Sequence, residues 1–349
     1  MATFSHLGIA LATAPMEARL VRDMPKGADW QFEPKWDGFR CLAFRDGAAV
    51  ELMSKSGKPL GRYFPEIVSA LLSLAEDHLV LDGELILPVS DGLSFAALQM
   101  RLHPAASRIA KLARETPAQL MLFDCLQLGD ELLVDEPLAI RRQQLEKFMR
   151  GRIPAAFLLS PRTFERDEAE RWLAESGEAL DGIVAKRRNG AYQPGERAML
   201  KRKLQRTADC IVGGFRYNAD RSLAASLLLG LYDEADRLHH VGFTSALSAS
   251  ERKAITPRLQ NLEGPSAFDG SAPGSPSRWS HGRSSDWVPI RPELVVEVGY
   301  DQITGQRFRH GTAFLRWRPD KAPRQCRMDQ LAPEAHPARL TALIGKSTA

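Results

Sequence analysis

The stretch EPKWDGFR, at residues 33–40 of this 349-residue chain, decides how the rest of the sequence is interpreted. In an extended segment alternate side chains share a face, so Glu33, Lys35 and Asp37 would point the same way. A lysine between two carboxylates is most often a surface ion pair. The alternative is an amine nucleophile, because a desolvated site or a nearby cation, such as a metal ion held by the carboxylates, favours the neutral amine.

Two carboxylates follow in LDGEL, at residues 81–85, where Asp82 and Glu84 lie in a run that is otherwise strongly apolar. Carboxylates in such a run need a partner, and a divalent metal ion or a ribose hydroxyl would serve. The segment DGIVAK, at residues 181–186, repeats the order of carboxylate, glycine and apolar residues. On its own, each of these motifs is as well explained by a turn or a strand end.

Basic residues dominate the next two motifs. In MLKRK, at residues 199–203, Lys201 and Lys203 alternate onto one face of an expected strand. Two such lysines repel each other unless an anion, most simply a phosphate, lies between them. RWRPDK, at residues 316–321, belongs to a longer stretch, 304–327, in which seven basic residues and one acid are interleaved with aromatic rings. That pattern favours contact with an anion or a nucleic acid.

The composition is that of an ordinary globular protein, with 44% hydrophobic and 26% charged residues. The length favours two domains, and no apolar run approaches the roughly 20 residues that span a bilayer. The four cysteines form no CxxC pair, which argues against a zinc ribbon and for free thiols in a reducing cytoplasm. We therefore expect a cytoplasmic protein without a membrane partner.

The character of the sequence changes near residues 204–207. Residues 1–203 hold 28 basic and 28 acidic side chains, so the formal net charge of +4 arises entirely from the remainder. The first part mixes strand-like and helix-like runs, whereas the second has about five short β-rich runs and one helical segment, which fits a small barrel of the OB type. A long loop rich in glycine, proline and serine, residues 264–285, lies inside this second part.

The order of these motifs resembles that of the covalent nucleotidyltransferases, and specifically of ATP-dependent DNA ligases of the small bacterial C type. The resemblance covers essentially the whole chain and is strongest in RTADCIVGGFR, at residues 206–216, and in the run from 296 to 326. It implies an α+β fold. An adenylation (nucleotidyltransferase) domain with antiparallel sheets and flanking helices, residues 1–204, would precede an all-β OB-fold domain, residues 205–349.

The resemblance also implies a reaction. In this family the lysine of the first motif, here Lys35, attacks the α-phosphate of ATP to form lysyl-AMP and release pyrophosphate. The AMP passes to the 5′-phosphate of a nick, and the 3′-hydroxyl then seals the strand. Each step is an in-line displacement that depends on positioning and charge neutralisation. ATP, Mg²⁺ or Mn²⁺, and nicked duplex DNA are the expected partners of a monomeric, nucleoid-associated enzyme of DNA repair.

Roles carry over position by position. The residues expected to act in catalysis are Lys35, Asp37, Arg40, Lys201 and Lys203. Those expected to bind ATP are Glu33, Lys35, Arg40, Glu84, Phe123, Lys186, Lys201, Lys203, Arg318, Asp320 and Lys321, with Phe123 stacked on adenine and Asp82 in support. The expected metal ligands are Asp37, Glu84 and Asp181. The expected DNA contacts are Arg40, Ser54, Lys55, Arg307, Arg309 and Arg316.

The sequence departs from the family pattern at two positions. Asp181 stands where the family usually has glutamate, which shortens the reach to a metal ion by one methylene. Lys55 stands where the second motif usually has arginine, and lysine offers a point charge in place of a bidentate fork. We expect altered metal preference or rate from the first change, and a weaker grip on the nick phosphate from the second.

Two alternatives remain open on sequence grounds. A nucleotidyltransferase of the RNA-capping or RNA-ligase kind shares the lysine chemistry, and a non-catalytic OB protein would explain the basic, aromatic second part. An NAD-dependent ligase is disfavoured, because the nicotinamide-binding segment and the cysteine zinc ligands of that class are not found here. Because few phosphates would be neutralised, we expect weak and strongly salt-dependent binding of nicks.

Overall fold

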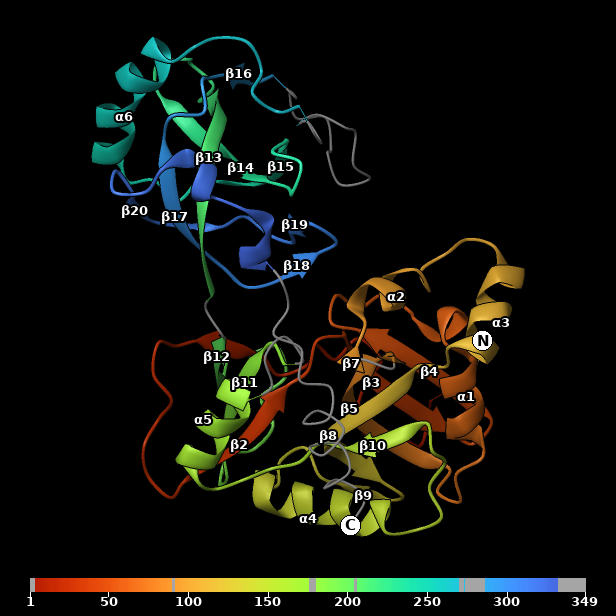
Figure 1. The fold of residues 1–349 in the computed structure, drawn as a ribbon. Coiled ribbons are helices and arrows are strands. Elements are labelled where there is room, and N and C mark those ends of the chain that lie inside the picture. Colours follow the sequence, from red (N-terminus) through yellow and green to blue (C-terminus); the bar gives the residue numbers. More distant parts are fainter. Residues whose placement is uncertain are drawn as a thin grey trace. The chain divides into compact units, whose positions relative to one another are not determined.

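The computed structural model describes residues 4–89, 92–175, 180–203, 206–269, 273 and 286–331. The described residues up to Lys203 form one compact unit and those from Arg206 form a second (Figure 1). Residues 204–205 of the expected domain boundary, and most of the expected loop at 264–285, lie outside the described residues. Among the described helices, none combines the length and apolar composition that crossing a bilayer requires.

The first unit contains a six-stranded sheet with helices packed against it (Figure 1). The strand β8 reads QLMLFDCLQL and is buried almost throughout, as expected for a strand covered on both faces. Helix α4 packs on β8, and α1 packs on β4. In spatial order the strands are β10 (Phe157–Leu159), β8 (Gln119–Leu128), β5 (His78–Ile86), β3 (Phe39–Asp46) and β4 (Ala49–Ser54), with β9 (Glu131–Leu132) beside β8. The helices are α1 (Pro65–Leu72), α2 (Phe95–Gln99), α3 (Ala106–Glu115) and α4 (Leu138–Met149).

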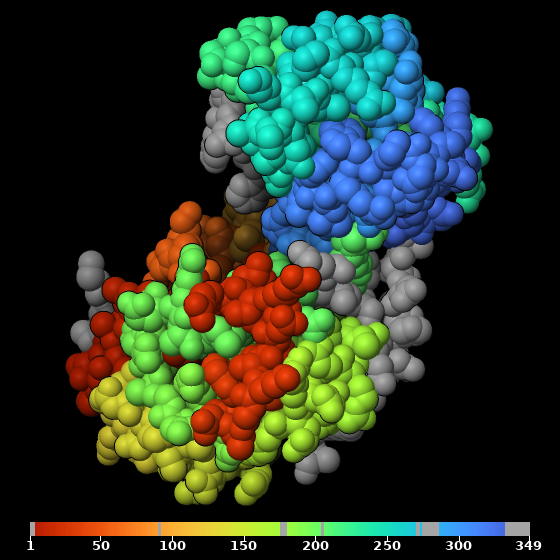
Figure 2. All heavy atoms as spheres, turned by 90° about the vertical axis from the view of Figure 1, so that its left-hand side faces the viewer, coloured from red at the N-terminus to blue at the C-terminus, as the bar shows by residue number. Residues whose placement is uncertain are grey.

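A smaller four-stranded sheet completes the first unit. Its order is β1 (Ala18–Leu20), β12 (Met199–Lys203), β11 (Gly182–Arg187) and β2 (Trp30–Lys35), and helix α5 (Arg166–Glu175) packs against β2 and β11. Figure 2 shows the N-terminal residues, in red, on the surface beside the green segments of this sheet. The sheet brings three sequence motifs side by side, because β2, β11 and β12 each carry one of them.

One position in this sheet, Gly182, leaves no room for a side chain between neighbouring strands. Gly182 lies opposite both Lys35 on β2 and Lys203 on β12. Its φ is 148°, and a Cβ atom there would lie 2.1 Å from the carbonyl oxygen of Arg202, so only glycine fits. The residue before it, Asp181, is therefore held between the two lysine-bearing strands.

The sheets are antiparallel as expected except at two edges. Strand β10 runs parallel to β8, and β1 runs parallel to β12. A parallel neighbour requires a crossover of a dozen or more residues, and α4 supplies it between β8 and β10. The short edge strands carried no alternation that would have revealed this direction from the sequence.

The second unit is a β-barrel of the OB type, which confirms the expected fold class. Its sheet order is β15 (Leu238–Thr244), β14 (Ala224–Tyr232), β13 (Arg206–Tyr217), β17 (Val295–Tyr300) and β20 (Ala313–Trp317). The two edges meet where the Thr312 amide donates to the carbonyl of Phe243 at 3.1 Å. Helix α6 (Ala249–Asn261) is the single helix longer than one turn among the described residues of this unit, and a Ser248–Glu251 capping box begins it.

Short elements connect these parts. In the first unit they are η1 (Gly61–Tyr63) and the paired strands β6 (Pro88–Val89) and β7 (Gly92–Leu93). In the second unit they are β16 (Val288–Pro289), the paired strands β18 (Ile303–Thr304) and β19 (Arg307–Phe308), and the turns η3 (Pro323–Gln325) and η4 (Met328–Leu331).

Candidate active site

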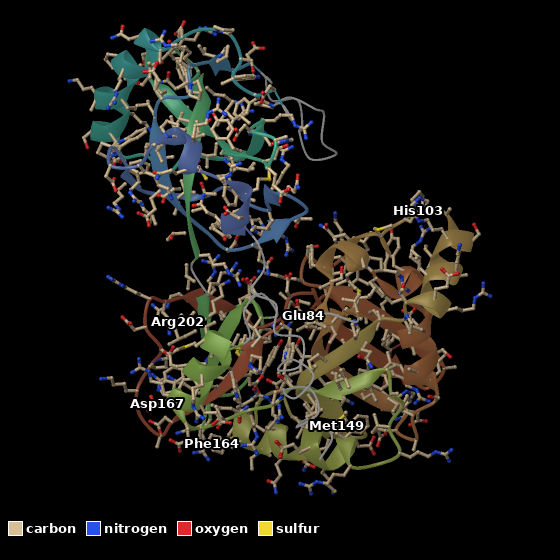
Figure 3. All side chains as sticks on the ribbon, viewed as in Figure 1. Glu84, His103, Met149, Phe164, Asp167 and Arg202 are labelled. Atoms are coloured by element: carbon tan, nitrogen blue, oxygen red, sulfur yellow. The ribbon has the colours of Figure 1, made fainter. Side chains whose placement is uncertain are left out.

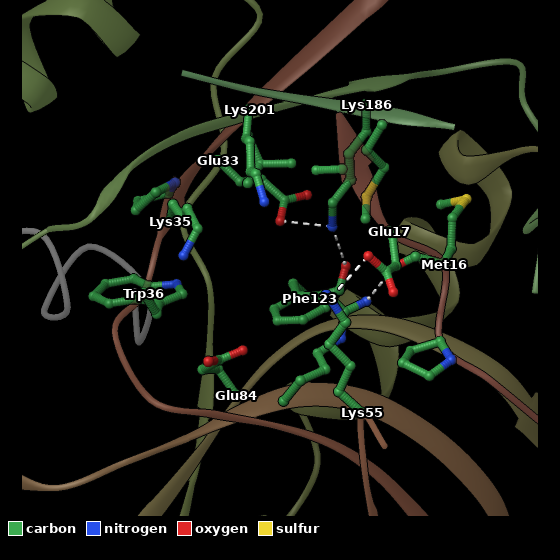
Figure 4. A pocket seen from close by; sticks show the side chains of 16 residues that line it. Met16, Glu17, Glu33, Lys35, Trp36, Lys55, Glu84, Phe123, Lys186 and Lys201 are labelled. Atoms are coloured by element: carbon green, nitrogen blue, oxygen red, sulfur yellow. Dashed lines mark hydrogen bonds and ion pairs between the residues drawn. The ribbon is translucent and has the colours of Figure 1, made fainter. Parts of the chain in front are cut away.

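A cavity of about 190 Å³ lies between the two sheets of the first unit. The smaller sheet contributes Glu33, Lys35, Lys186 and Lys201, and the larger sheet contributes Arg40, Glu84 and Phe123. Figure 3 marks Glu84 where the two sheets face each other, and Figure 4 shows the lining side chains at close range. Seven of the residues predicted to bind ATP therefore meet in one cavity.

One part of the cavity is built on a buried ion pair. The Lys186 ammonium lies 2.8 Å from a Glu33 carboxylate oxygen, and both side chains are less than 5% exposed (Figure 4). Gln31 donates a second hydrogen bond to Glu33 at 2.7 Å, and Lys186 also donates to the Phe123 carbonyl at 3.4 Å. The same ammonium lies 4.4 Å from the centre of the Phe123 ring. A buried pair with this many partners is satisfied, and it presents an aromatic face beside polar groups.

A second lysine–carboxylate group involves Lys35. Its ammonium contacts the carboxylate of Asp181, which also lies 3.5 Å from the Lys203 ammonium. Both lysine side chains are 24% exposed, so this group is open to solvent in a way that the Lys186 pair is not. Lys201 lines the cavity nearby, and burial together with the charges of Lys35 and Lys203 lowers its pKa. Lys35 and Lys203 share one carboxylate, and Lys201 adds a third positive charge nearby, so a phosphate entering the cavity would relieve the mutual repulsion of the ammonium groups.

The sequence interpretation of Asp37 was partly wrong. Strand β2 ends at Lys35, so the alternation that aligns Glu33 with Lys35 does not extend to Asp37. The chain turns instead at Gly38, where a Cβ atom would lie 2.0 Å from the carbonyl of Leu85. Asp37 still acts electrostatically on the site, since its charge is among the influences that raise the pKa of Glu84.

Arg40 and Glu84 face each other across the β3–β5 ladder. Arg40 donates from Nε and Nη2 to the two oxygens of the fully buried Asp82, each at 2.6 Å. Burial opposes the charge on Arg40, but Asp82 outweighs it and raises the pKa of Arg40 above its ordinary value. Burial raises the pKa of Glu84 to about 7, against the opposing influence of Lys35 and Arg40.

Tyr192 completes this network and was not singled out in the sequence. Its hydroxyl donates to Asp82 at 2.7 Å, and the residue as a whole is only 3% exposed. The segment NGAYQPG that carries it has turn residues and no repeated charge or spacing. A single tyrosine in such a loop gives no signal that it belongs to an active site, because the contact depends on residues more than 100 positions away.

The expected metal ligands do not form a protein-only cluster. Among the described residues, groups of three or more histidine, cysteine or acidic ligand atoms within 4.8 Å of one another occur at His6, Asp46 and His78 and at Glu76, Asp77 and His78. Neither group includes Asp37, Glu84 or Asp181. Of the three, Glu84 lines the cavity. Mg²⁺ is usually bound by one or two carboxylates together with substrate phosphates, so a protein-only cluster is not required for such an ion.

A larger cavity of about 960 Å³ adjoins the first and shares Arg40, Lys55 and Glu84 with it. Ser54 lines this second cavity, and its hydroxyl lies 3.2 Å from that of Ser56. Lys55 is 57% exposed and pairs with Glu17 at 2.8 Å. The lysine that replaces the family's usual arginine is therefore at the border of both cavities and can reach an anion in either.

The last motif lies in the second unit and is organised by a carboxylate that the sequence interpretation missed. Arg318 donates to both oxygens of Asp209, at 2.8 and 2.9 Å, and Lys321 pairs with the same carboxylate at 2.8 Å. Arg318 also pairs with Asp320, through nitrogen–oxygen distances of 2.9–3.2 Å. Asp209 belongs to RTADCIVGGFR, which was noted for its resemblance to ligases and not for this charge.

Three of the four arginines predicted to contact DNA lie in the second unit, and each has a partner there. Arg316 pairs with Glu297 at 2.6 Å on neighbouring strands. Arg307 lies 2.8 Å from the Nδ1 atom of His240, and Arg309 hydrogen-bonds the Gln302 side chain. Arg316 remains 62% exposed in its pair, which leaves it accessible to a phosphate.

Comparison with known proteins agrees with this geometry. A family model for the ATP-dependent DNA ligase domain matches residues 12–203, and one for the C-terminal region of ATP-dependent DNA ligases matches residues 220–321. DNA ligase C2 of Mycolicibacterium smegmatis is 44% identical over 344 residues, covering 94% of this chain and 96% of that protein. DNA ligase C of Mycobacterium tuberculosis is 43% identical over 345 residues, covering 93% and 95%.

A solved structure supports the fold independently. It comes from a structure–function study of Lig E DNA ligases and DNA binding with a minimal scaffold, and it has a TM-score of 0.54 over 87% of this chain and 99% of that one. Because the two sequences are 15% identical, this likeness supports the fold alone. The family models span both units, which removes the support for a capping-type enzyme or a non-catalytic OB protein. The chain belongs to the ATP-dependent DNA ligases.

Proposed function

We propose that Lys35 is the residue on which this ATP-dependent DNA ligase carries AMP. As a member of the family, the chain uses ATP to join the ends of nicked DNA. The observation that supports Lys35 is its place in the cavity, where its ammonium shares the Asp181 carboxylate with Lys203. The lysine of the cavity that is buried, Lys186, is instead paired with Glu33 and donates to the Phe123 carbonyl.

The nucleotide would enter with its base toward Phe123 and the Glu33–Lys186 pair. The ring offers an apolar face, and the pair offers a fixed donor and acceptor to the edge of the base. Glu84 would accept from a ribose hydroxyl. Lys201 and Lys203 would hold the α-phosphate, which would replace Asp181 as the anion between the ammonium groups.

Lys35 must release Asp181 before it can react. As an ammonium it has no lone pair, so the proton must leave before nitrogen attacks phosphorus and pyrophosphate departs. Incoming phosphate weakens the hold of Asp181 by competing for the lysines. Asp181, Glu84 and Asp37 are the residues that would hold Mg²⁺ or Mn²⁺ together with substrate phosphates, and such an ion supplies charge neutralisation when bound.

The second cavity would receive the nick. Ser54 lines this cavity, and Lys55 and Arg40 line both cavities. Arg307, Arg309 and Arg316 would contact the DNA backbone from the second unit, while Arg318, Asp320 and Lys321 would act on the pyrophosphate during the first step. The same proposal includes an adenylation domain of residues 1–204, an OB domain of residues 205–349, and a monomer that acts at nucleoid DNA in repair.

A label-transfer experiment tests the proposal. The purified protein is incubated with α-labelled ATP and Mg²⁺, denatured, and assayed for label on the polypeptide, with Lys35→Ala beside it. The control is Lys111→Ala, because Lys111 is 65% exposed on α3 and pairs only with its helix neighbour Glu115 among the described residues. We expect label on the wild type and the control, discharge by nicked DNA, and none on Lys35→Ala. Label on Lys35→Ala equal to the wild type would overturn the assignment.

Salt gives a second test, directed at the DNA side. Each phosphate neutralised by a lysine or arginine releases counterions, so the binding constant for a nicked duplex should fall steeply as salt rises. Lys55→Ala should reduce the slope of log K against log salt by about 1. A slope unchanged from wild type would remove Lys55 from the DNA contacts.

A further inference from the structure

A closed ring of hydrogen bonds ties Tyr192 to the wall of the nucleotide cavity. The Tyr192 hydroxyl accepts from the Met16 amide at 2.9 Å and donates to Asp82 at 2.7 Å. Arg40 donates to the two Asp82 oxygens at 2.6 Å each, and its Nη2 also donates to the Met16 carbonyl at 3.2 Å. The ring therefore links four segments that are distant in sequence, those that contain Met16, Arg40, Asp82 and Tyr192.

The ring has a defined direction of donation. Burial and the neighbouring Asp82 carboxylate raise the pKa of Tyr192 well above its ordinary value, so the hydroxyl keeps its proton and remains a donor. Asp82 is fully buried and accepts three hydrogen bonds, two from Arg40 and one from Tyr192. Loss of one donor would leave part of a buried carboxylate unsatisfied, and the remaining partners would shift to compensate.

Arg40 is the member of the ring that meets the substrate side. It lines both cavities, and its guanidinium lies 4.5 Å from the centre of the Phe123 ring. The ring of hydrogen bonds uses Nε and Nη2. Within the part of the chain that the structure describes, no hydrogen bond engages Nη1. One edge of the guanidinium is therefore held, and the other nitrogen can bind a ligand oxygen.

We propose that Tyr192 is a positioning residue for the ligase reaction, acting through Asp82 to fix the Arg40 guanidinium where it contacts a phosphate. Tyr192 lines neither cavity, so it acts without touching the substrate. The phosphate belongs to ATP or to the nick, since Arg40 borders both cavities. The inference rests on the proposed function, because it assumes that the first cavity binds the nucleotide that Lys35 attacks.

The test is a double-mutant cycle between Tyr192→Phe and Arg40→Ala, measured in two single-turnover assays. One assay follows self-adenylation with ATP, and the other follows sealing of a pre-adenylated nick. We expect Tyr192→Phe to lower the rate constant about tenfold in whichever step Arg40→Ala impairs, with the ATP concentration for half-maximal rate changed less than about twofold. In the Arg40→Ala background, Tyr192→Phe should change the same rate less than about twofold. The step affected identifies the phosphate.

Tyr232→Phe is the matched control, because Tyr232 is 6% exposed in the second unit and loses the same hydroxyl. It should stay within about twofold of wild type in both assays.

The inference would be overturned if Tyr192→Phe reacted as fast as the wild type in both assays. It would also be overturned if Tyr192→Phe lowered the rate constant by the same factor in the Arg40→Ala background as in the wild type. If Tyr192→Phe fails to fold, Asp82→Asn tests the same linkage from the other partner, with the same non-additivity expected. Absence of label on the wild type would reject the proposed function itself, whereas an active wild type with an unaffected Tyr192→Phe rejects only the positioning role.

Discussion

Two lysine–carboxylate groups in the same small sheet illustrate how similar residues serve different ends. Lys186 and Glu33 are almost fully buried, paired one to one, and supported by Gln31. Lys35 and Lys203 are a quarter exposed and share the single carboxylate of Asp181. The first group is fully satisfied and suits a fixed recognition surface. The second has more cations than anions, so it can exchange Asp181 for a phosphate.

The largest effect should come from removing the nucleophile of the open group. Lys35→Ala should reduce self-adenylation by at least about 1,000-fold, because no other group can form the phosphoramidate at that position. The free energy of unfolding should change by less than about 1 kcal/mol, since the pair is partly exposed. Label incorporation and denaturant unfolding of the same preparations measure the two quantities. If Lys35→Ala lost both self-adenylation and the folded structure, Lys35 would not differ from the buried pair in its contribution to stability.

The buried pair should show the opposite balance. Glu33→Leu leaves the Lys186 ammonium buried without its carboxylate, which should cost about 3–5 kcal/mol of unfolding free energy. Adding Lys186→Met should restore much of that loss, because two apolar side chains replace two charges. Urea unfolding of the single and double variants checks this. If the double variant were as unstable as Glu33→Leu alone, the loss of stability would not come from the unpaired Lys186 ammonium.

Asp181→Asn should separate catalysis from stability in the open group. The change removes the anion shared by Lys35 and Lys203, and it should slow self-adenylation about 100-fold. It should cost less unfolding free energy than Glu33→Leu, because both lysine side chains are 24% exposed and keep access to water. Asp181→Glu, which restores the residue usual in the family, is the control and should remain within about tenfold of wild type, with any difference appearing in the ratio of Mg²⁺ to Mn²⁺ activity. A variant Asp181→Asn with full activity would remove this carboxylate from the mechanism.

The smallest expected effect concerns the pH dependence of stability. Because the pKa of Glu84 is raised from 4.5 to about 7, the folded protein binds this proton more tightly than the unfolded chain. That stabilisation is fully present below about pH 4.5 and is lost as the pH rises through 7. Relative to wild type, Glu84→Gln should therefore gain about 2 kcal/mol in unfolding free energy between pH 5 and pH 8. Parallel pH dependences for the two proteins would contradict the shifted pKa.

The sequence predicted which residues line the cavity better than it predicted how they pair. Strand alternation alone aligned Glu33 with Lys35, and the motifs on β11 and β12 followed as neighbours in the small sheet. The partners depend on register between strands far apart in the chain. The link from Arg40 through Asp82 to Tyr192 and the grip of Asp209 on Arg318 were therefore not visible.

Where the prediction failed, the cause was local geometry. Alternation was extended to Asp37, but the strand ends at Lys35 and the backbone turns where Gly38 meets the carbonyl of Leu85. The parallel edges formed by β1 and β10 escaped notice because strands of three residues carry too little pattern to show direction. The general architecture survived both errors, since it depends on longer runs such as β5, β8 and β13.

The most direct test of the account is to locate the AMP. After reaction with ATP and Mg²⁺, the denatured protein is digested and the modified peptide is sequenced by mass spectrometry under conditions that preserve the phosphoramidate bond. The account predicts AMP on Lys35 and on no other lysine of the cavity, with the modification lost after incubation with nicked DNA or pyrophosphate. AMP on Lys186, Lys201 or Lys203 in place of Lys35 would contradict the assignment of the open group as the reactive one.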